Sequence, residues 1–211
     1  MERERRKEFV FELKRKMFHF ILGVFIACSV YYLYPYYEKL LLIPLVTAII
    51  IMWVAPRLPI EHVMSKKLLY HFEREHDKKY FPFKGAIYFG IGIIPPLVLL
   101  PVDLATGEPL LACAVISVLA GGDAFATLVG KFYGKYRFRH KSIEGFIAFI
   151  TFSYMMASPF VDPKTAFALA FIGAIIEFFN TIDDNLAIPI GLTVIIEIAN
   201  VIAPNMLFTM H

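Results

Sequence analysis

The stretch GGDAFATLVGKFYGKYRFRHKSIEG, residues 121–145, lies between two long apolar runs but contains one aspartate, five basic residues and five glycines. Asp123 stands about two helical turns inside the first apolar run. Because a carboxylate is costly to desolvate, we interpret Asp123 as functional, with a purely structural charge pair as the alternative. Ala126, Gly130 and Gly134 follow at i+3, i+7 and i+11, which predicts a small-residue face that admits a neighbouring helix.

The composition indicates a membrane protein. Hydrophobic residues make up 58% of the 211 residues, and the mean hydropathy is +0.64. Soluble domains contain about 45–50% apolar residues, so a water-soluble protein is disfavoured. We expect one all-α, multi-pass domain over residues 1–211 in the cell membrane, with membrane lipids and no nucleic acid as partners. Cys28 and Cys113 both lie in apolar runs and are interpreted as small hydrophobic residues. The oligomeric state stays open.

Seven apolar runs are long enough to be candidate transmembrane helices. They cover residues 18–34, 40–55, 83–101, 110–130, 144–160, 165–181 and 186–206. Of the 21 Lys and Arg residues, 19 fall in residues 1–17, 56–84 and 131–143, and only Lys39 and Lys164 lie in the other connections. Positive loops face the cytoplasm, so the N-terminus and the second, fourth and sixth connections are predicted to be cytoplasmic.

Two charged segments flank the first two spans. Phe9, Leu13, Met17 and Phe20 recur with charged residues between them, which predicts an amphipathic N-terminal helix on the membrane surface. The connection 56–82 has a helical apolar period and predicts a second interfacial helix.

The segment after Asp123 carries groups that suit phosphate. Lys141 and Ser142 can donate to phosphate oxygens just before the next helix, whose first N–H groups are free. Ser142 is equally suited to be an N-cap. Glu144 suits either a first-turn partner of the helix dipole or a metal ligand.

Two more polar clusters lie at predicted cytoplasmic ends of spans. Glu177, Asn180 and Asp184 share one helical face and are flanked by Asp183 and Asn185. Five oxygen-bearing side chains with no cation among them indicate a Mg2+ site, with a solvated loop as the alternative.

The other cluster opens the first span and contains Glu12, Lys16 and His19. Glu12 and His19 are on one face, and a histidine that only reaches the interface is the alternative for His19.

Carboxylates for a divalent cation beside phosphate donors indicate phosphoryl or nucleotidyl transfer. A phosphate-binding loop of the GxxxxGK[ST] type is absent, since Lys131 is followed by Phe132 and residue 125 is Phe. A nucleotide site would therefore be of another kind. Glu197, three residues before Asn200 in the last span, is outside these clusters. It either pairs with Asn200 or lines a groove for lipid.

These pieces together resemble the CTP-dependent polyprenol kinase family, which contains dolichol kinase, phytol kinase and CTP-using diacylglycerol kinases. The matching pieces are ELKRKMFH at 12–19, Arg74-Glu75 with KGAIYFGIG at 84–92, GDAFATLVGKFYG at 122–134, KSIEG at 141–145, and Glu177 with DDNLAIP at 183–189. The resemblance implies phosphoryl transfer from CTP to a long isoprenoid alcohol, with Mg2+ or Ca2+, at the cytoplasmic face.

The resemblance also implies roles for individual residues. Catalytic candidates, in order of preference as the base, are Asp123, Glu177 and His19. The implied metal ligands are Asp123, Glu144 and Asp184. The implied nucleotide-binding residues are Gly122, Lys141, Ser142, Glu144, Gly145 and Asn185. Alternative functions are a cytidylyltransferase that makes a CDP-lipid, a kinase for phytol, geranylgeraniol or diacylglycerol, and a small-anion transporter.

Overall fold

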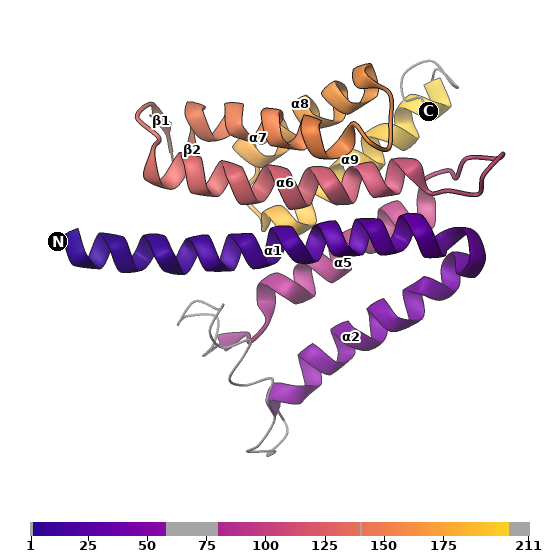
Figure 1. The fold of residues 1–211 in the computed structure, drawn as a ribbon, viewed down its shortest axis with the longest axis horizontal. Helices are drawn as coiled ribbons and strands as arrows, with labels where there is room; N and C mark the ends of the chain where they lie inside the picture. Colours follow the sequence, from indigo (N-terminus) through magenta and orange to yellow (C-terminus); the bar gives the residue numbers. More distant parts are fainter. Residues whose placement is uncertain (1, 58–79, 140, 203–211) are drawn as a thin grey trace.

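A computed structural model describes residues 2–57, 80–139 and 141–202. This part of the chain is almost entirely helical (Figure 1). Its helices are α1 (Glu2–Tyr37), η1 (Glu38–Leu41), α2 (Leu42–Val54), η2 (Ala55–Arg57), α5 (Lys84–Leu99), α6 (Leu110–Phe132), α7 (Ile143–Ala157), α8 (Pro163–Phe179) and α9 (Asp184–Ile202). Two short antiparallel strands, β1 (Arg137–Phe138) and β2 (Lys141–Ser142), precede α7.

Every predicted apolar run overlaps one of the main helices. Three helical stretches are long and apolar enough to cross a membrane, namely Arg6–Arg57, Leu110–Phe132 and Asp184–Ile202, and α5 and α7 are shorter apolar helices. The first stretch folds back at η1 into α1 and α2 (Figure 1). None of the 13 residues of α2 is buried, although the helix is strongly apolar. These features are compatible with a membrane protein.

The N-terminal segment is not a separate surface helix, so that prediction is wrong. It is continuous with the first apolar run in α1, which has 36 residues and is therefore about 54 Å long. A bilayer core is about 30 Å thick, so α1 is longer than one crossing requires. The polar face of this segment turns inward: Glu12 is 3% exposed and Lys16 is 7% exposed. This face packs on α6.

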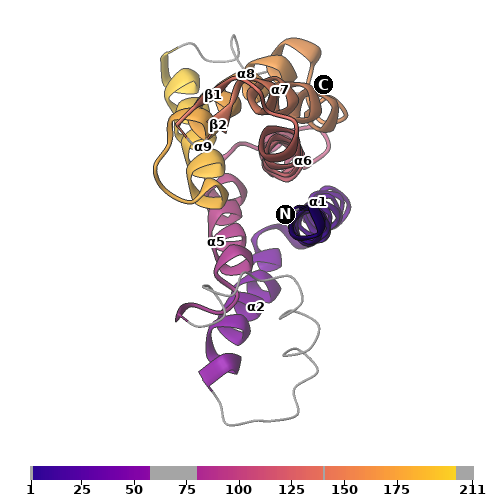
Figure 2. The same ribbon diagram turned by 90° about the vertical axis from the view of Figure 1, so that its left-hand side faces the viewer.

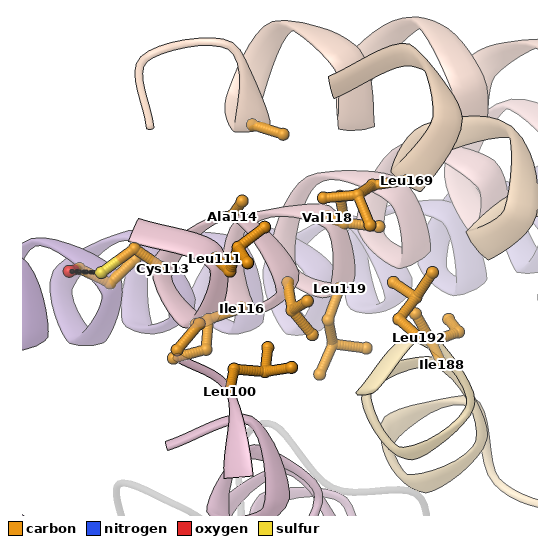
Figure 3. Packing of buried hydrophobic residues seen from close by; sticks show 14 of the residues in the cluster. Leu100, Leu111, Cys113, Ala114, Ile116, Val118, Leu119, Leu169, Ile188 and Leu192 are labelled. Atoms are coloured by element: carbon orange, nitrogen blue, oxygen red, sulfur yellow. Dashed lines mark hydrogen bonds between the residues drawn. The ribbon is translucent and has the colours of Figure 1, made fainter. Parts of the chain in front are cut away.

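The core is centred on α6. Helix α6 lies among α1, α7, α8 and α9, and its first two thirds are almost completely buried (Figure 2). Leu119 of α6 belongs to the buried cluster shown in Figure 3, together with Ile188 and Leu192 of α9. Cys113 is buried there, Cys28 is exposed, and both are free, as predicted for small hydrophobic residues.

Glycines let α7 approach α6 closely. A Cβ added to Gly122 would meet Ser153 Oγ and the ring of Phe149, both on α7. The helix continues unbroken through Gly121 and Gly122, so these glycines serve packing and do not loosen the backbone.

Part of the sequence interpretation lies outside the described residues. The interfacial helix predicted in the connection 56–82 falls largely in residues 58–79. Arg74 and Glu75, which contribute to the family resemblance, also belong to this range.

The close contact at Gly122 gives a stability prediction. Gly122→Ala is expected to lower the free energy of unfolding by about 1–3 kcal/mol, because the added methyl overpacks the α6–α7 contact. Gly85→Ala is the matched control, because a Cβ there meets nothing within 4 Å and alanine favours the helix. Thermal unfolding in detergent compares the two variants. Equal melting temperatures would contradict the packing role of Gly122.

Candidate functional site

A cleft of about 770 Å³ lies where α1, α5, α6, the β1–β2 hairpin and the α8–α9 junction meet. It lies toward the end of the bundle that carries the N-terminus and the hairpin (Figure 1). Residues from all four polar clusters of the sequence line it, although more than a hundred positions separate the first from the last. The predicted site residues in its wall are His19, Asp123, Lys141, Ser142, Gly145, Glu177, Asp184 and Asn185.

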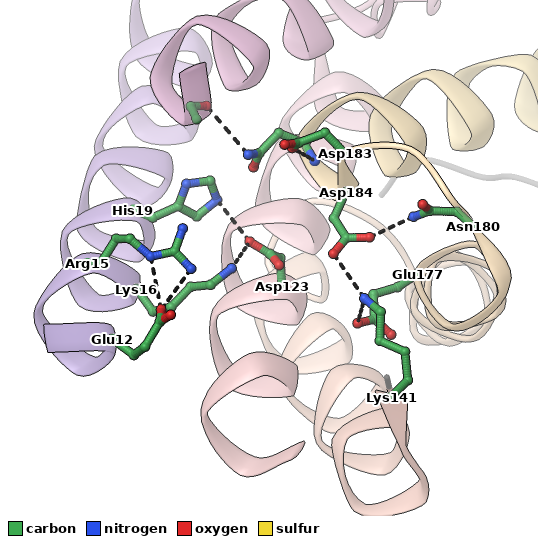
Figure 4. Close-up of polar contacts among 12 residues, drawn as sticks. Glu12, Arg15, Lys16, His19, Asp123, Lys141, Glu177, Asn180, Asp183 and Asp184 are labelled. Atoms are coloured by element: carbon green, nitrogen blue, oxygen red, sulfur yellow. Dashed lines mark hydrogen bonds and ion pairs between the residues drawn. The ribbon is translucent and has the colours of Figure 1, made fainter. Parts of the chain in front are cut away.

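One side of the cleft holds a buried ion pair between α1 and α6. Lys16 Nζ donates to Asp123 Oδ2 at 2.6 Å, and both side chains are less than one tenth exposed. His19 Nε2 lies 3.6 Å from the same oxygen and is buried without a hydrogen-bond partner in the described part of the chain. Figure 4 shows Lys16 and His19 pointing from α1 toward Asp123. Asp123 therefore has a cation at contact distance and an imidazole beside it.

The same face of α1 holds a second charged group nearby. The Glu12 carboxylate accepts hydrogen bonds from Arg15 Nε at 3.0 Å and Nη2 at 2.8 Å, and from Lys131 Nζ at 3.3 Å. Lys131 also pairs with Glu8 at 2.8 Å. These contacts join the start of α1 to the end of α6 beside the cleft.

The opposite side of the cleft holds Lys141 between two carboxylates. Its Nζ donates to Glu177 Oε1 at 2.5 Å and to Asp184 Oδ2 at 3.0 Å (Figure 4). Asn180 Nδ2 donates to the other Asp184 oxygen at 2.6 Å. Burial lowers the pKa of Lys141, but Asp184 and Glu177 raise it by more, so the net pKa lies above the usual value of 10.5. Lys141 therefore places one cation within the acidic cluster.

Ser142 is the N-cap of α7, as one of the two sequence interpretations expected. Its Oγ accepts the N–H of Gly145 at 3.0 Å. Gly130 and Gly145 pack around this hydroxyl, and a Cβ on either would approach it within 3.2 Å. The capped helix therefore begins at the cleft wall, where Ser142 is 3% exposed.

Gly122 and Glu144 are the predicted site residues that do not line the cleft. Gly122 faces α7 instead. Glu144 Oε1 accepts the backbone N–H groups of Lys135 at 2.9 Å and Tyr136 at 3.3 Å, so it fastens the turn before β1. The structure therefore does not bring the three predicted metal ligands, Asp123, Glu144 and Asp184, together. Within residues 2–57, 80–139 and 141–202, no group of three His, Cys, Asp or Glu side chains is arranged to hold a metal ion.

Asn185 presents a second buried polar atom without a hydrogen bond in the described residues, its Oδ1. Its Nδ2 donates to the Gly85 carbonyl at 3.4 Å, and its backbone N–H donates to Asp183 Oδ1 at 3.1 Å. Asn185 thereby joins the start of α9 to the start of α5 in the cleft wall.

Several basic residues of the cleft wall were absent from the predicted site. They are Arg15, Lys16, Lys84, Lys131 and Arg137. The signal for Lys16 was its position three residues before His19 and four after Glu12, on the same helical face. Sequence reasoning missed Lys16 because positive residues in the charged segments were interpreted mainly as topology signals. Glu197 does not line the cleft and lies in the later part of α9.

The fold and site define a class: a helical protein with helices long and apolar enough to span a membrane and with a polar cleft toward one end of the bundle. The sequence is 34% identical over 195 residues to the uncharacterized protein MJ1137 of Methanocaldococcus jannaschii, covering 88% of this chain and 93% of that protein. The chain belongs to the family of this archaeal protein. A scan of protein-family models gave no match. A search of solved structures also gave none.

The Lys16–Asp123 pair gives a second stability prediction. Lys16→Met or Asp123→Asn alone is expected to destabilise the protein by roughly 3–5 kcal/mol, because each leaves an uncompensated buried charge or an unmet partner. The double variant is expected to lose much less than the sum of the two. Thermal unfolding of all four proteins in one detergent forms the double-mutant cycle. Additive losses would show that the two side chains do not interact.

Proposed function

We propose that this protein transfers the γ-phosphoryl group of CTP to the hydroxyl of a membrane-embedded isoprenoid alcohol of the polyprenol type. The observation that carries the proposal is the convergence of carboxylates, basic side chains and an apolar wall on one cleft. The charged part of the cleft suits a nucleotide, and its apolar part suits a lipid. The choice of CTP over other nucleotides rests on the resemblance to the polyprenol kinases.

The charge of the cleft favours a polyanionic ligand. Its wall has six basic side chains and four acidic ones. The basic residues are Arg15, Lys16, Lys84, Lys131, Arg137 and Lys141, and the acidic residues are Asp123, Glu177, Asp183 and Asp184. Most of these cations already hold a carboxylate, so phosphate oxygens can replace one charged partner by another without leaving a buried cation unpaired.

The described residues fit a divalent cation that arrives with the nucleotide. Mg2+ is commonly held by one or two carboxylates, with substrate phosphates and water completing its shell. Asp123 and Asp184 are the cleft carboxylates that would hold it, whereas Glu144, in the first turn of α7, does not line the cleft. When bound, Mg2+ would neutralise charge that develops on the transferring phosphoryl group.

His19 is the strongest candidate for the general base. The carboxylates of Asp123 and Glu177 each accept a hydrogen bond from a lysine, whereas His19 Nε2 has no such partner within the described chain. In the proposed step, the alcohol oxygen bonds to the γ-phosphorus, the bond from that phosphorus to the β-phosphate oxygen breaks, and CDP leaves. The hydroxyl proton passes to His19, while Lys16 and Lys141 hold phosphate oxygens.

The membrane arrangement belongs to the same proposal. The cleft lies toward the end with the N-terminus, and 19 of the 21 Lys and Arg residues lie in segments expected on one side. We propose seven crossings with this end in the cytoplasm, where CTP is available. Helices α2, α7 and α8 are shorter than a bilayer core requires, so they would cross with help from local thinning of the bilayer.

The direct test uses purified protein, CTP labelled on either the α or the γ phosphate, and a panel of dolichol, phytol, geranylgeraniol and diacylglycerol. We expect label from the γ position, and none from the α position, in an isoprenoid phosphate. Label from the α position would identify a cytidylyltransferase. No labelled lipid from CTP or ATP would refute the kinase function and leave a transporter as the alternative.

Substitution of a charged cleft residue gives a fourth prediction. Lys141→Gln is expected to raise the KM for CTP at least tenfold, because it removes a phosphate donor from the wall, and Asp123→Asn is expected to lower kcat/KM about 100-fold or more. Asp103→Asn is the matched control, because Asp103 lies in the loop between α5 and α6, away from the cleft. Elution volume and melting temperature identify variants that fail to fold. Full activity of Asp123→Asn would remove this cleft as the active site.

A further inference from the structure

The cleft wall on α1 changes from charged to apolar toward the C-terminal end of the helix. The wall follows one face of this helix from Arg15 and Lys16 through His19 to Leu22. The step from Arg15 to Leu22 corresponds to about 10 Å along the helix axis. The facing wall on α5 begins at Lys84 and ends at Ala86 and Phe89. Both walls therefore pass from charged to apolar in the same direction, away from the charged end of the cleft.

The apolar part is continuous with surface that faces outward from the bundle. Phe18 lines the cleft and is 37% exposed, and Phe25, two helical turns further along α1, is 67% exposed. Figure 1 shows that α1 and α2 diverge from the turn that joins them. Figure 2 shows α5 between α9 and α2. In a membrane, the material that covers such a surface is hydrocarbon.

Two contacts mark the boundary between the charged and apolar parts. His19 packs edge to face on Phe89 of α5, with ring centroids 4.8 Å apart. His19 Nε2 is buried, has no hydrogen bond in the described residues, and lies 3.6 Å from Asp123. A ligand with a hydroxyl at the level of His19 and hydrocarbon beyond it would satisfy this nitrogen while covering Phe18 and Leu22.

We propose that the groove between α1 and α5, formed by Phe18, Leu22, Ala86 and Phe89, holds the hydrocarbon chain of the acceptor alcohol, which enters from the bilayer. The proposal rests on the proposed function and names the substrate class more closely. The His19–Phe89 contact bridges the two helices at the charged end of the groove, and such a closed end suits one hydrocarbon chain better than two. A single-chain prenol is therefore accepted in preference to diacylglycerol.

The test uses geranylgeraniol with a diazirine on the second isoprene unit from its hydroxyl, incorporated with the full-length protein into phosphatidylcholine vesicles. After irradiation, we expect mass spectrometry to find the adduct on peptides of α1 and α5 that contain residues 18–25 and 83–90. Excess unlabelled geranylgeraniol should displace it, and a dioleoylglycerol competitor should not. Adducts spread evenly over all exposed helices, or displaced equally by both competitors, would overturn the proposal.

Matched variants sharpen the result. Leu22→Trp fills the groove and is expected to reduce the α1 and α5 adducts at least tenfold, while Ile21→Trp places the same side chain on the exposed neighbour outside the cleft and is expected to leave them unchanged. Ala86→Leu narrows the groove from the opposite wall and replaces Leu22→Trp if that variant does not fold. Equal labelling of the folded groove variants and Ile21→Trp would refute the groove.

These experiments distinguish a failure of the lipid groove from a failure of the kinase function. A protein that binds the photoreactive prenol in the groove but transfers no label from CTP keeps the lipid site and refutes the kinase function. A protein that phosphorylates geranylgeraniol equally well with Leu22→Trp, Ala86→Leu and Ile21→Trp keeps the kinase function and refutes the groove.

Discussion

The need to neutralise charge inside an apolar bundle constrains this structure more than any other interaction. Asp123 is 2% exposed and Glu177 is 4% exposed, and most of the other buried residues are apolar. A buried carboxylate persists only with a partner, and the partners here are lysines distant in sequence. Lys16 brings α1 onto α6, and Lys141 brings the β1–β2 hairpin onto the α8–α9 junction. The ion pairs therefore select which helices meet at the cleft.

The same pairs connect the fold to the proposed chemistry. A site whose cations are already held by carboxylates is compact without ligand, yet each cation can donate to phosphate oxygens instead. Close α6–α7 packing at glycine holds the capped start of α7 in the cleft wall, with Ser142 beside Lys141. Below these groups the wall becomes apolar, so a water-soluble nucleotide and a membrane-embedded alcohol can reach one point from two directions.

The sequence predicted the helices well and the site in part. The apolar runs predicted all the main helices, because bilayer-facing and core-facing segments must both be apolar and helical. Asp123, Lys141 and Asp184 were recognisable as ionisable residues at the ends of such runs. Glu144 was interpreted as a metal ligand because a carboxylate in the first turn of a helix suits several partners. Only the three-dimensional arrangement shows that it binds the amides of Lys135 and Tyr136.

By itself, the sequence determined the helical class, the approximate helix positions and the charge asymmetry of the loops, since these follow from local hydropathy and composition. The tertiary structure decided which charges pair. Lys16, one of several basic residues in a charged N-terminal segment, became the partner of Asp123 because α1 is continuous and packs its polar face on α6. Lys141 lies between Glu177 and Asp184 because the hairpin packs on the α8–α9 junction. Pairing over such sequence distances depends on helix packing, which no local pattern encodes.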